Sequence, residues 1–111
     1  GLAGIYLAKA IEEMGMTSQL APKTTLAASG QEACRLVASG QVALGVAQTS
    51  TARSVAGVAV IGTLPRELGV AIVVGAGIVA TTGQRAASET LLGFLKSPAA
   101  AAIIRTRGME P

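Results

Sequence analysis

Apolar residues are spaced along this chain in two ways, one typical of helices and one typical of buried strands. Helical spacing predicts four helices, over residues 5–15, 31–38, 84–95 and 99–106. Short continuous apolar runs predict buried strands, over residues 23–27, 42–47, 58–61 and 70–80. Helices and strands therefore alternate through the first half of the chain. This order predicts an α/β fold, with a small, mostly parallel sheet covered by helices on both faces.

Local signals mark where several of these helices should begin and end. Ser29 is a favourable N-cap for the second helix, and Glu32 lies in its first turn, where a negative charge is favourable. Ser97-Pro98 is a strong start for the last helix. Glycines are expected to end three of the helices, at Gly15, Gly40 and Gly108.

Composition supports one folded domain and argues against nucleic-acid binding. Of the 111 residues, 50% are apolar and 14% are charged, which is unlike a disordered chain. Tyr6 and Phe94 are the only aromatic residues, so the core must be built from Ala, Val, Ile and Leu. The net charge of +3 comes from scattered basic residues. Because a nucleic-acid surface needs a basic cluster or aromatic stacking platform, we expect no such partner.

Reactive groups are too few to predict catalysis or metal binding. The chain has no His and a single cysteine, Cys34, so we expect neither a zinc or haem site nor an internal disulfide. Cys34 lies in a helical pattern and is expected to be a small core residue. The six acidic residues are scattered rather than paired. We therefore predict a protein that is not an enzyme and uses no cofactor or metal.

One motif resembles a nucleotide-binding fingerprint but lies in the wrong context. The sequence GAGIVA at residues 75–80 matches G-x-G-x-x-A after an apolar run. That motif requires a tight turn from a strand into a helix. Here the apolar pattern continues through Gly75 and Gly77, and the next helix is expected only near Gln84. The glycines are better explained as sites where a strand bends or another backbone approaches.

Three points of the chain are candidates for holding a small anion. They are two helix starts and the polar residues that follow the run 42–47, where one helical turn is expected. Backbone N–H groups at a helix start are unpaired and lie at the positive end of the helix dipole, and glycine there lets a ligand approach. The candidate ligand-binding residues are Ala3, Gly4, Ser29, Gly30, Gln31, Gln48 and Thr49.

The order of short sequence segments resembles the second half of molybdate-binding periplasmic proteins. The similar segments are AGIYLAK (3–9), LAPK (20–23), LVASGQVALGV (36–46), GVAVIGTLP (57–65), FLKSPAAA (94–101) and GMEP (108–111). They follow one another along nearly the whole chain. The resemblance implies a type 2 periplasmic binding protein of an ABC importer, with residues 1–111 forming its second, C-terminal lobe.

The resemblance also implies a ligand and partners. The ligand would be molybdate or a similar oxyanion, held between this lobe and a first lobe that is not in this chain, for delivery to a membrane permease and its ATPase. In the family the second lobe offers backbone N–H groups at helix starts, which match Ala3 and Gly30, and a tyrosine hydroxyl. Gln48 takes the place of that tyrosine, which puts molybdate specificity in doubt because an amide also carries an acceptor oxygen.

Three further expectations concern assembly, location and an alternative function. The tail, residues 98–111, would pack on the first lobe, so its helix would be left uncovered here and we expect two copies to form a homodimer. Because half of the donors would belong to the first lobe, and closure over the anion is impossible without it, we expect this chain alone to bind an oxyanion weakly or not at all. A periplasmic location is implied. The alternative function is effector sensing in a bacterial transcription regulator that uses the same lobe.

Overall fold

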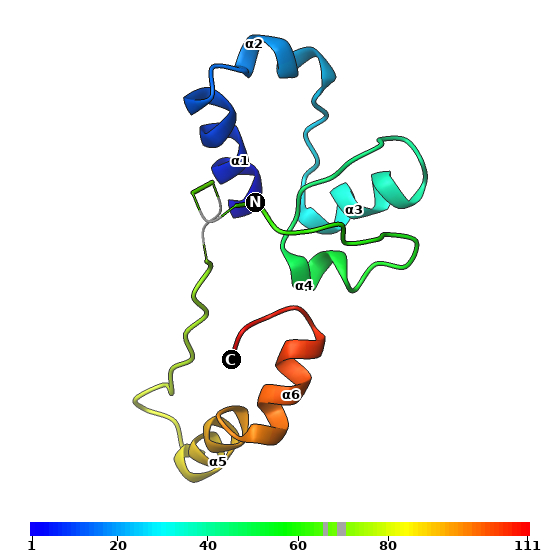
Figure 1. The fold of residues 1–111 in the computed structure, drawn as a ribbon. Helices are drawn as coiled ribbons and strands as arrows, with labels where there is room; N and C mark the ends of the chain where they lie inside the picture. The colour runs from blue at the N-terminus through cyan, green and yellow to red at the C-terminus, as the bar shows by residue number, and fades with distance from the viewer. Residues whose placement is uncertain (66, 69–70) are drawn as a thin grey trace. The chain divides into compact units, whose positions relative to one another are not determined.

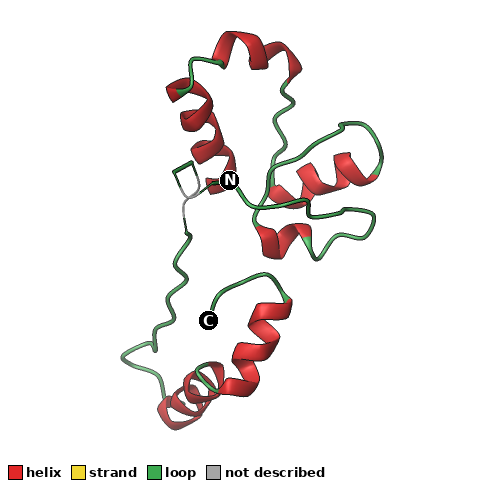
Figure 2. Ribbon diagram, viewed as in Figure 1, coloured by secondary structure: helices red, strands yellow, loops and turns green. Residues whose placement is uncertain are grey.

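The computed structural model describes residues 1–65, 67–68 and 71–111, and the described residues form helices joined by irregular segments (Figures 1 and 2). The chain divides into two compact units, Gly1–Val70 and Ala71–Pro111. Unit 1 holds the α-helices α1 (Leu2–Glu13), α2 (Thr17–Leu20), α3 (Gly30–Ala38) and α4 (Thr49–Ala52), and the 3-10 helix η1 (Ala21–Lys23). Unit 2 holds α5 (Arg85–Leu95) and α6 (Pro98–Thr106).

The predicted parallel sheet is wrong, and with it the α/β fold class of a type 2 lobe. No residue that the structure describes belongs to a strand (Figure 2). The apolar runs 23–27, 42–47, 58–61 and 71–80 form no hydrogen-bonded ladder, and residue 70 of the last run lies outside the described residues. A strand exists only through hydrogen bonds to a neighbouring strand, whereas an apolar run reports only a preference for burial. The pattern was therefore insufficient to predict pairing.

The predicted helices are confirmed, because helix formation depends on signals from neighbouring residues. The helices expected over 31–38, 84–95 and 99–106 are α3, α5 and α6, each within two residues of the predicted bounds. The first helix begins at Leu2, earlier than predicted. One helical turn was expected after the run 42–47, and α4 provides it.

Three glycines end helices as predicted. Gly15, Gly40 and Gly108 have φ values of 68°, 73° and 78°, a backbone conformation that side chains disfavour. Each donates its N–H to the carbonyl three residues earlier, and the following residue donates to the carbonyl five residues before itself. This pair of hydrogen bonds satisfies carbonyls that the helix leaves unpaired.

In unit 1, the segment that follows α3 folds back along that helix (Figure 1). A Cβ built on Gly45 would lie 2.9 Å from Cγ2 of Val37, so the loop passes directly over the helix there. Further along, Gly57 has φ 83° and its Cβ position is 3.4 Å from Cβ of Ala38. Cys34 on α3 is buried, as predicted for a small core residue.

In unit 2, α5 and α6 pack as a helical hairpin joined at Ser97. The side-chain oxygen of Ser97 accepts from the N–H of Ala100 at 3.2 Å, which confirms the predicted cap, and Pro98 occupies the first turn. Ala100 is the buried residue of this hairpin. On the outer surface of α5, Arg85 and Glu89 form an exposed ion pair at 3.6 Å, which adds little stability.

Both units leave much apolar surface open. Among the described residues, only Ala10, Cys34 and Ala100 are buried apolar residues. The chain exposes 8502 Å², whereas two compact units of these sizes would expose roughly 6,700 Å² together. Large apolar side chains such as Leu26, Val73 and Ile103 are more than half exposed. Burial within each unit is thus limited to close contacts between a few small residues.

Candidate functional site

The start of α3 is built by reciprocal hydrogen bonds between its first residues. The side-chain oxygen of Ser29 accepts from the N–H of Glu32 at 3.1 Å, so Ser29 is the N-cap that the sequence predicts. In return, Oε2 of Glu32 accepts from the N–H of Ala28 at 2.8 Å. The arrangement is a variant of the capping box, in which an acidic side chain satisfies a donor before the helix. The Ser29 hydroxyl proton stays available to a ligand.

The start of α4 lies beside the start of α3 (Figure 1). A Cβ placed on Gly30 would lie 3.4 Å from Cβ of Ala47 and 3.7 Å from Cγ2 of Thr51. These distances are ordinary van der Waals contacts, and the absence of a side chain on Gly30 keeps its backbone close to α4. The two helix starts therefore form one surface of unit 1.

Five of the seven predicted site residues belong to this surface. We call it the α3–α4 surface, formed by Ser29, Gly30, Gln31, Gln48 and Thr49. Ser29, Gln31 and Gln48 are exposed, while Gly30 and Thr49 are half-buried. Gln48 precedes α4 and its side chain makes no capping hydrogen bond. The surface thus offers hydroxyl, amide and backbone N–H groups at accessible positions.

The other two predicted site residues belong to a different helix start. Ala3 and Gly4 lie in the first turn of α1, which begins without a side-chain cap and without an acidic residue. The N–H of Gly4 donates to the carbonyl of Gly1 at 3.0 Å, and no atom lies within 4 Å of a Cβ placed on Gly4. Among the described helices, α1 packs mainly on α2. Ala3 and Gly4 therefore belong to a helix start that is separate along the chain from the α3–α4 surface.

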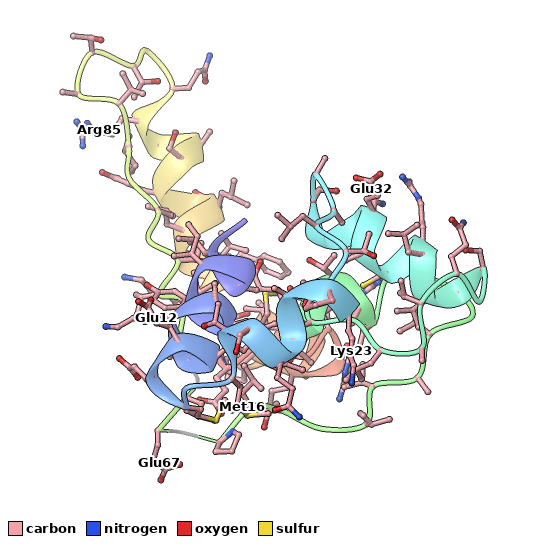
Figure 3. The ribbon with its side chains drawn as sticks, turned by 90° about the horizontal axis from the view of Figure 1, so that it is seen from above. Glu12, Met16, Lys23, Glu32, Glu67 and Arg85 are labelled. Carbon is pink, nitrogen blue, oxygen red and sulfur yellow. The ribbon has the colours of Figure 1, made fainter. Side chains whose placement is uncertain are left out.

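A negative charge lies at the α3–α4 surface, next to Gln31 in the chain. Glu32 projects from the first turn of α3 and is exposed (Figure 3). A carboxylate there complements the helix dipole and also opposes a bound anion. Glu32 was predicted as a first-turn acid, but its hydrogen bond with the N–H of Ala28 was not predicted. The signal that could have revealed this bond is the spacing Ser29-x-x-Glu32.

Sequence reasoning also missed what brings the two helix starts together. The contact between Gly30 and Ala47 depends on two small residues far apart in sequence, and no local pattern reports it. In the part of the chain that the structure describes, no group of three or more His, Cys, Asp or Glu residues could hold a metal ion. The chemistry available at this surface is hydrogen-bond donation to a ligand.

Comparison with known proteins places the chain in a family. It belongs to the bacterial extracellular solute-binding proteins, whose family model matches residues 1–110. No curated protein and no solved structure matches it. The family supports a role in binding a small solute for transport, without catalysis, and a secreted or periplasmic location. No helix among residues 1–65, 67–68 and 71–111 is long and apolar enough to cross a membrane.

Proposed function

We propose that this chain supplies part of the binding site for a small oxyanion, with molybdate the first candidate, in a periplasmic solute-binding protein. The bound anion would be passed to the permease and ATPase of an ABC importer. Membership of the solute-binding family supports the transport role. The single observation that supports the ligand class is the contact that brings the starts of α3 and α4 together at Gly30, Ala47 and Thr51.

The α3–α4 surface has the donors that an oxyanion needs. Backbone N–H groups at the start of α3 face outward from the helix end, and Ser29 can donate its hydroxyl proton while it accepts from Glu32. Gln48 can donate two amide hydrogens, and Thr49 adds a hydroxyl. Hydrogen bonds to a charged group contribute about 1.5–3 kcal/mol each, so a few of them hold an anion without a basic side chain.

The remaining donors would come from the first lobe, by resemblance to the molybdate-binding proteins. On that basis the 111-residue chain alone should bind molybdate with a dissociation constant weaker than micromolar. Ala3 and Gly4 join the site in this proposal as additional backbone donors from the uncapped start of α1. Effector sensing in a transcription regulator was the alternative, and the extracellular family description favours transport over it.

Gln48 provides the direct test of this site. Gln48→Ala should weaken molybdate binding by about five- to 150-fold, which corresponds to 1–3 kcal/mol for one donor to a charged ligand. The measurement is calorimetric titration of the solute-binding protein with molybdate, and with sulfate in a parallel series. Gln84→Ala is the matched control, because Gln84 is also an exposed residue before a helix and makes no side-chain cap.

Equal affinities for Gln48→Ala and the unchanged protein would mean that Gln48 is only a surface residue. Tighter binding of sulfate than of molybdate would keep the oxyanion class and reject molybdate as the ligand.

Glu32 provides a second test, in which the substitution should strengthen anion binding instead of weakening it. Glu32→Gln keeps a side-chain oxygen that can accept from Ala28 and removes the negative charge beside the bound anion. Binding should become tighter by about three- to tenfold, because the like charges of a carboxylate and a nearby anion repel by about 1 kcal/mol in a solvated site. The gain should shrink as salt is added. Glu89→Gln in unit 2 is the control and should leave affinity unchanged; a salt-independent gain would argue against repulsion.

A further inference from the structure

The segment formed by residues 45–48 runs along α3. At its beginning, a Cβ placed on Gly45 would lie 2.9 Å from Cγ2 of Val37, in the second half of α3. Two residues further on, Cβ of Ala47 lies 3.4 Å from a Cβ placed on Gly30, the first residue of α3. The segment therefore contacts α3 at two points, which are about two turns apart along that helix.

The first of these contacts leaves no room for a side chain on the segment. A distance of 2.9 Å is well below the optimum separation of two carbon atoms, which is about 3.5–4.0 Å, so only glycine fits at position 45 while Val37 is present. Val37 is half-buried, and a β-branched side chain in a helix has one strongly preferred rotamer. The side chain of Val37 therefore determines how closely the segment approaches α3.

The last residue of the segment is Gln48, which comes directly after the second contact and precedes α4. Its side chain makes no capping hydrogen bond, so the place of its amide depends on the backbone that leads to it. Val37 is about 10 Å along the helix axis from Gly30, too far to touch an anion bound at the start of α3. Any effect of Val37 on such an anion must therefore pass through the segment.

We infer that Val37 is a positioning residue for the oxyanion site, which holds residues 45–48 at the distance from α3 where Gln48 and the start of α3 bind the same anion. The inference rests on the proposed function and adds to it a residue that touches no ligand. A donor must be held to within about 0.5 Å to bind well, and packing behind it provides that precision.

Changing the sizes of both side chains at the first contact tests this role. Val37→Ala removes the methyl groups on which the segment rests, and Gly45→Ala adds a methyl group that must push the segment away. Each change alone should weaken molybdate binding by about three- to tenfold. The two together should restore affinity to within about twofold of the unchanged protein, because the added methyl group fills the space that Val37→Ala leaves. Calorimetric titration of the solute-binding protein with molybdate measures all four affinities.

The dependence on Gln48 has its own test. In a protein that already carries Gln48→Ala, Val37→Ala should change molybdate affinity by less than about twofold, because the donor that it positions is gone. Val42→Ala is the matched control, since Val42 is also a half-buried valine of unit 1 and lies outside residues 45–48. It should lower stability and leave affinity unchanged.

Three results would overturn the inference and leave the proposed function standing. They are normal affinity in both single variants, losses that multiply in the double variant, and a loss from Val37→Ala that is as large with Gln48→Ala as without it. If the unchanged protein binds neither molybdate nor sulfate, or if Gln48→Ala changes nothing, the proposed function and this inference both fail. Circular dichroism checks that each variant is folded. If Val37→Ala does not fold, Gly45→Ala tests the same contact, and normal affinity there contradicts the inference.

Discussion

Residues 42–47 and residues 71–80 have the same kind of apolar sequence but lie in different surroundings. Both runs carry glycine among Val, Leu, Ile and Ala, and both predict a buried strand. The first run packs on α3, where Gly45 approaches Val37. The second makes no such contact, and Gly75 and Gly77 face open space. The comparison shows that an apolar run reports a need for burial, while the neighbour that supplies it is determined elsewhere in the chain.

The largest difference between unit 1 and unit 2, which contain these two runs, should appear at Gly57. Gly57→Ala would force a side chain into a φ of 83° and bring Cβ to 3.4 Å from Cβ of Ala38. We expect the free energy of unfolding to fall by about 2 kcal/mol. Gly83→Ala is the control in unit 2, where φ is not positive and the space is open, and it should change stability by less than about 0.5 kcal/mol. Urea unfolding followed by circular dichroism measures both, and equal losses would contradict the comparison.

Two further Gly→Ala substitutions, one in each unit, should change the free energy of unfolding in opposite directions. Gly45→Ala would place Cβ 2.9 Å from Cγ2 of Val37, an overpacked contact that should cost about 1–2 kcal/mol. Gly93→Ala lies inside α5 with open space around it and should stabilise the helix by about 0.5–1 kcal/mol. Adding Val37→Ala should recover part of the Gly45→Ala loss in a double-mutant cycle. If the cycle shows no coupling, the loop does not press on Val37.

The serine N-caps should contribute equally to stability in the two units. Ser29 and Ser97 each accept from the N–H three residues later, at 3.1 and 3.2 Å. Ser29→Ala and Ser97→Ala should each lower the free energy of unfolding by about 1 kcal/mol. The corresponding threonine variants should restore most of it, because Thr keeps the hydroxyl. A loss at only one of the two positions would mean that the other hydroxyl does not stabilise its helix.

Sequence patterns predicted those parts of the fold that depend on neighbouring residues. The caps at Ser29 and Ser97 and the glycine ends of α1, α3 and α6 need only a few adjacent positions, and the structure confirms them. The sheet was wrong because pairing joins distant segments, and an apolar run carries no information about its partner. The resemblance of short segments nevertheless indicated a solute-binding protein, and the family match confirms that class.

The candidate site was predictable only in part, for the same reason. Ser29 and Gly30 were identified from the cap, and Gln48 and Thr49 from the polar turn after an apolar run. The contact of Gly30 with Ala47 and Thr51 is what brings these pairs together, and it joins residues that are 17 and more positions apart. Ala3 and Gly4 were grouped with them only as another helix start, and no local pattern reports which helix starts lie side by side.

Nuclear magnetic resonance titration of the ¹⁵N-labelled chain with molybdate can both detect weak binding and locate it on the chain. If the α3–α4 surface holds the anion, the amides of Gly30, Gln31 and Thr49 and the side-chain amide of Gln48 should show shifts that saturate at millimolar or near-millimolar molybdate. The amides of Ala99 and Ala100, at the capped start of α6, provide an internal control and should not move. Shifts at α6 as large as those at α3, or no shift at the α3–α4 surface, would contradict the account.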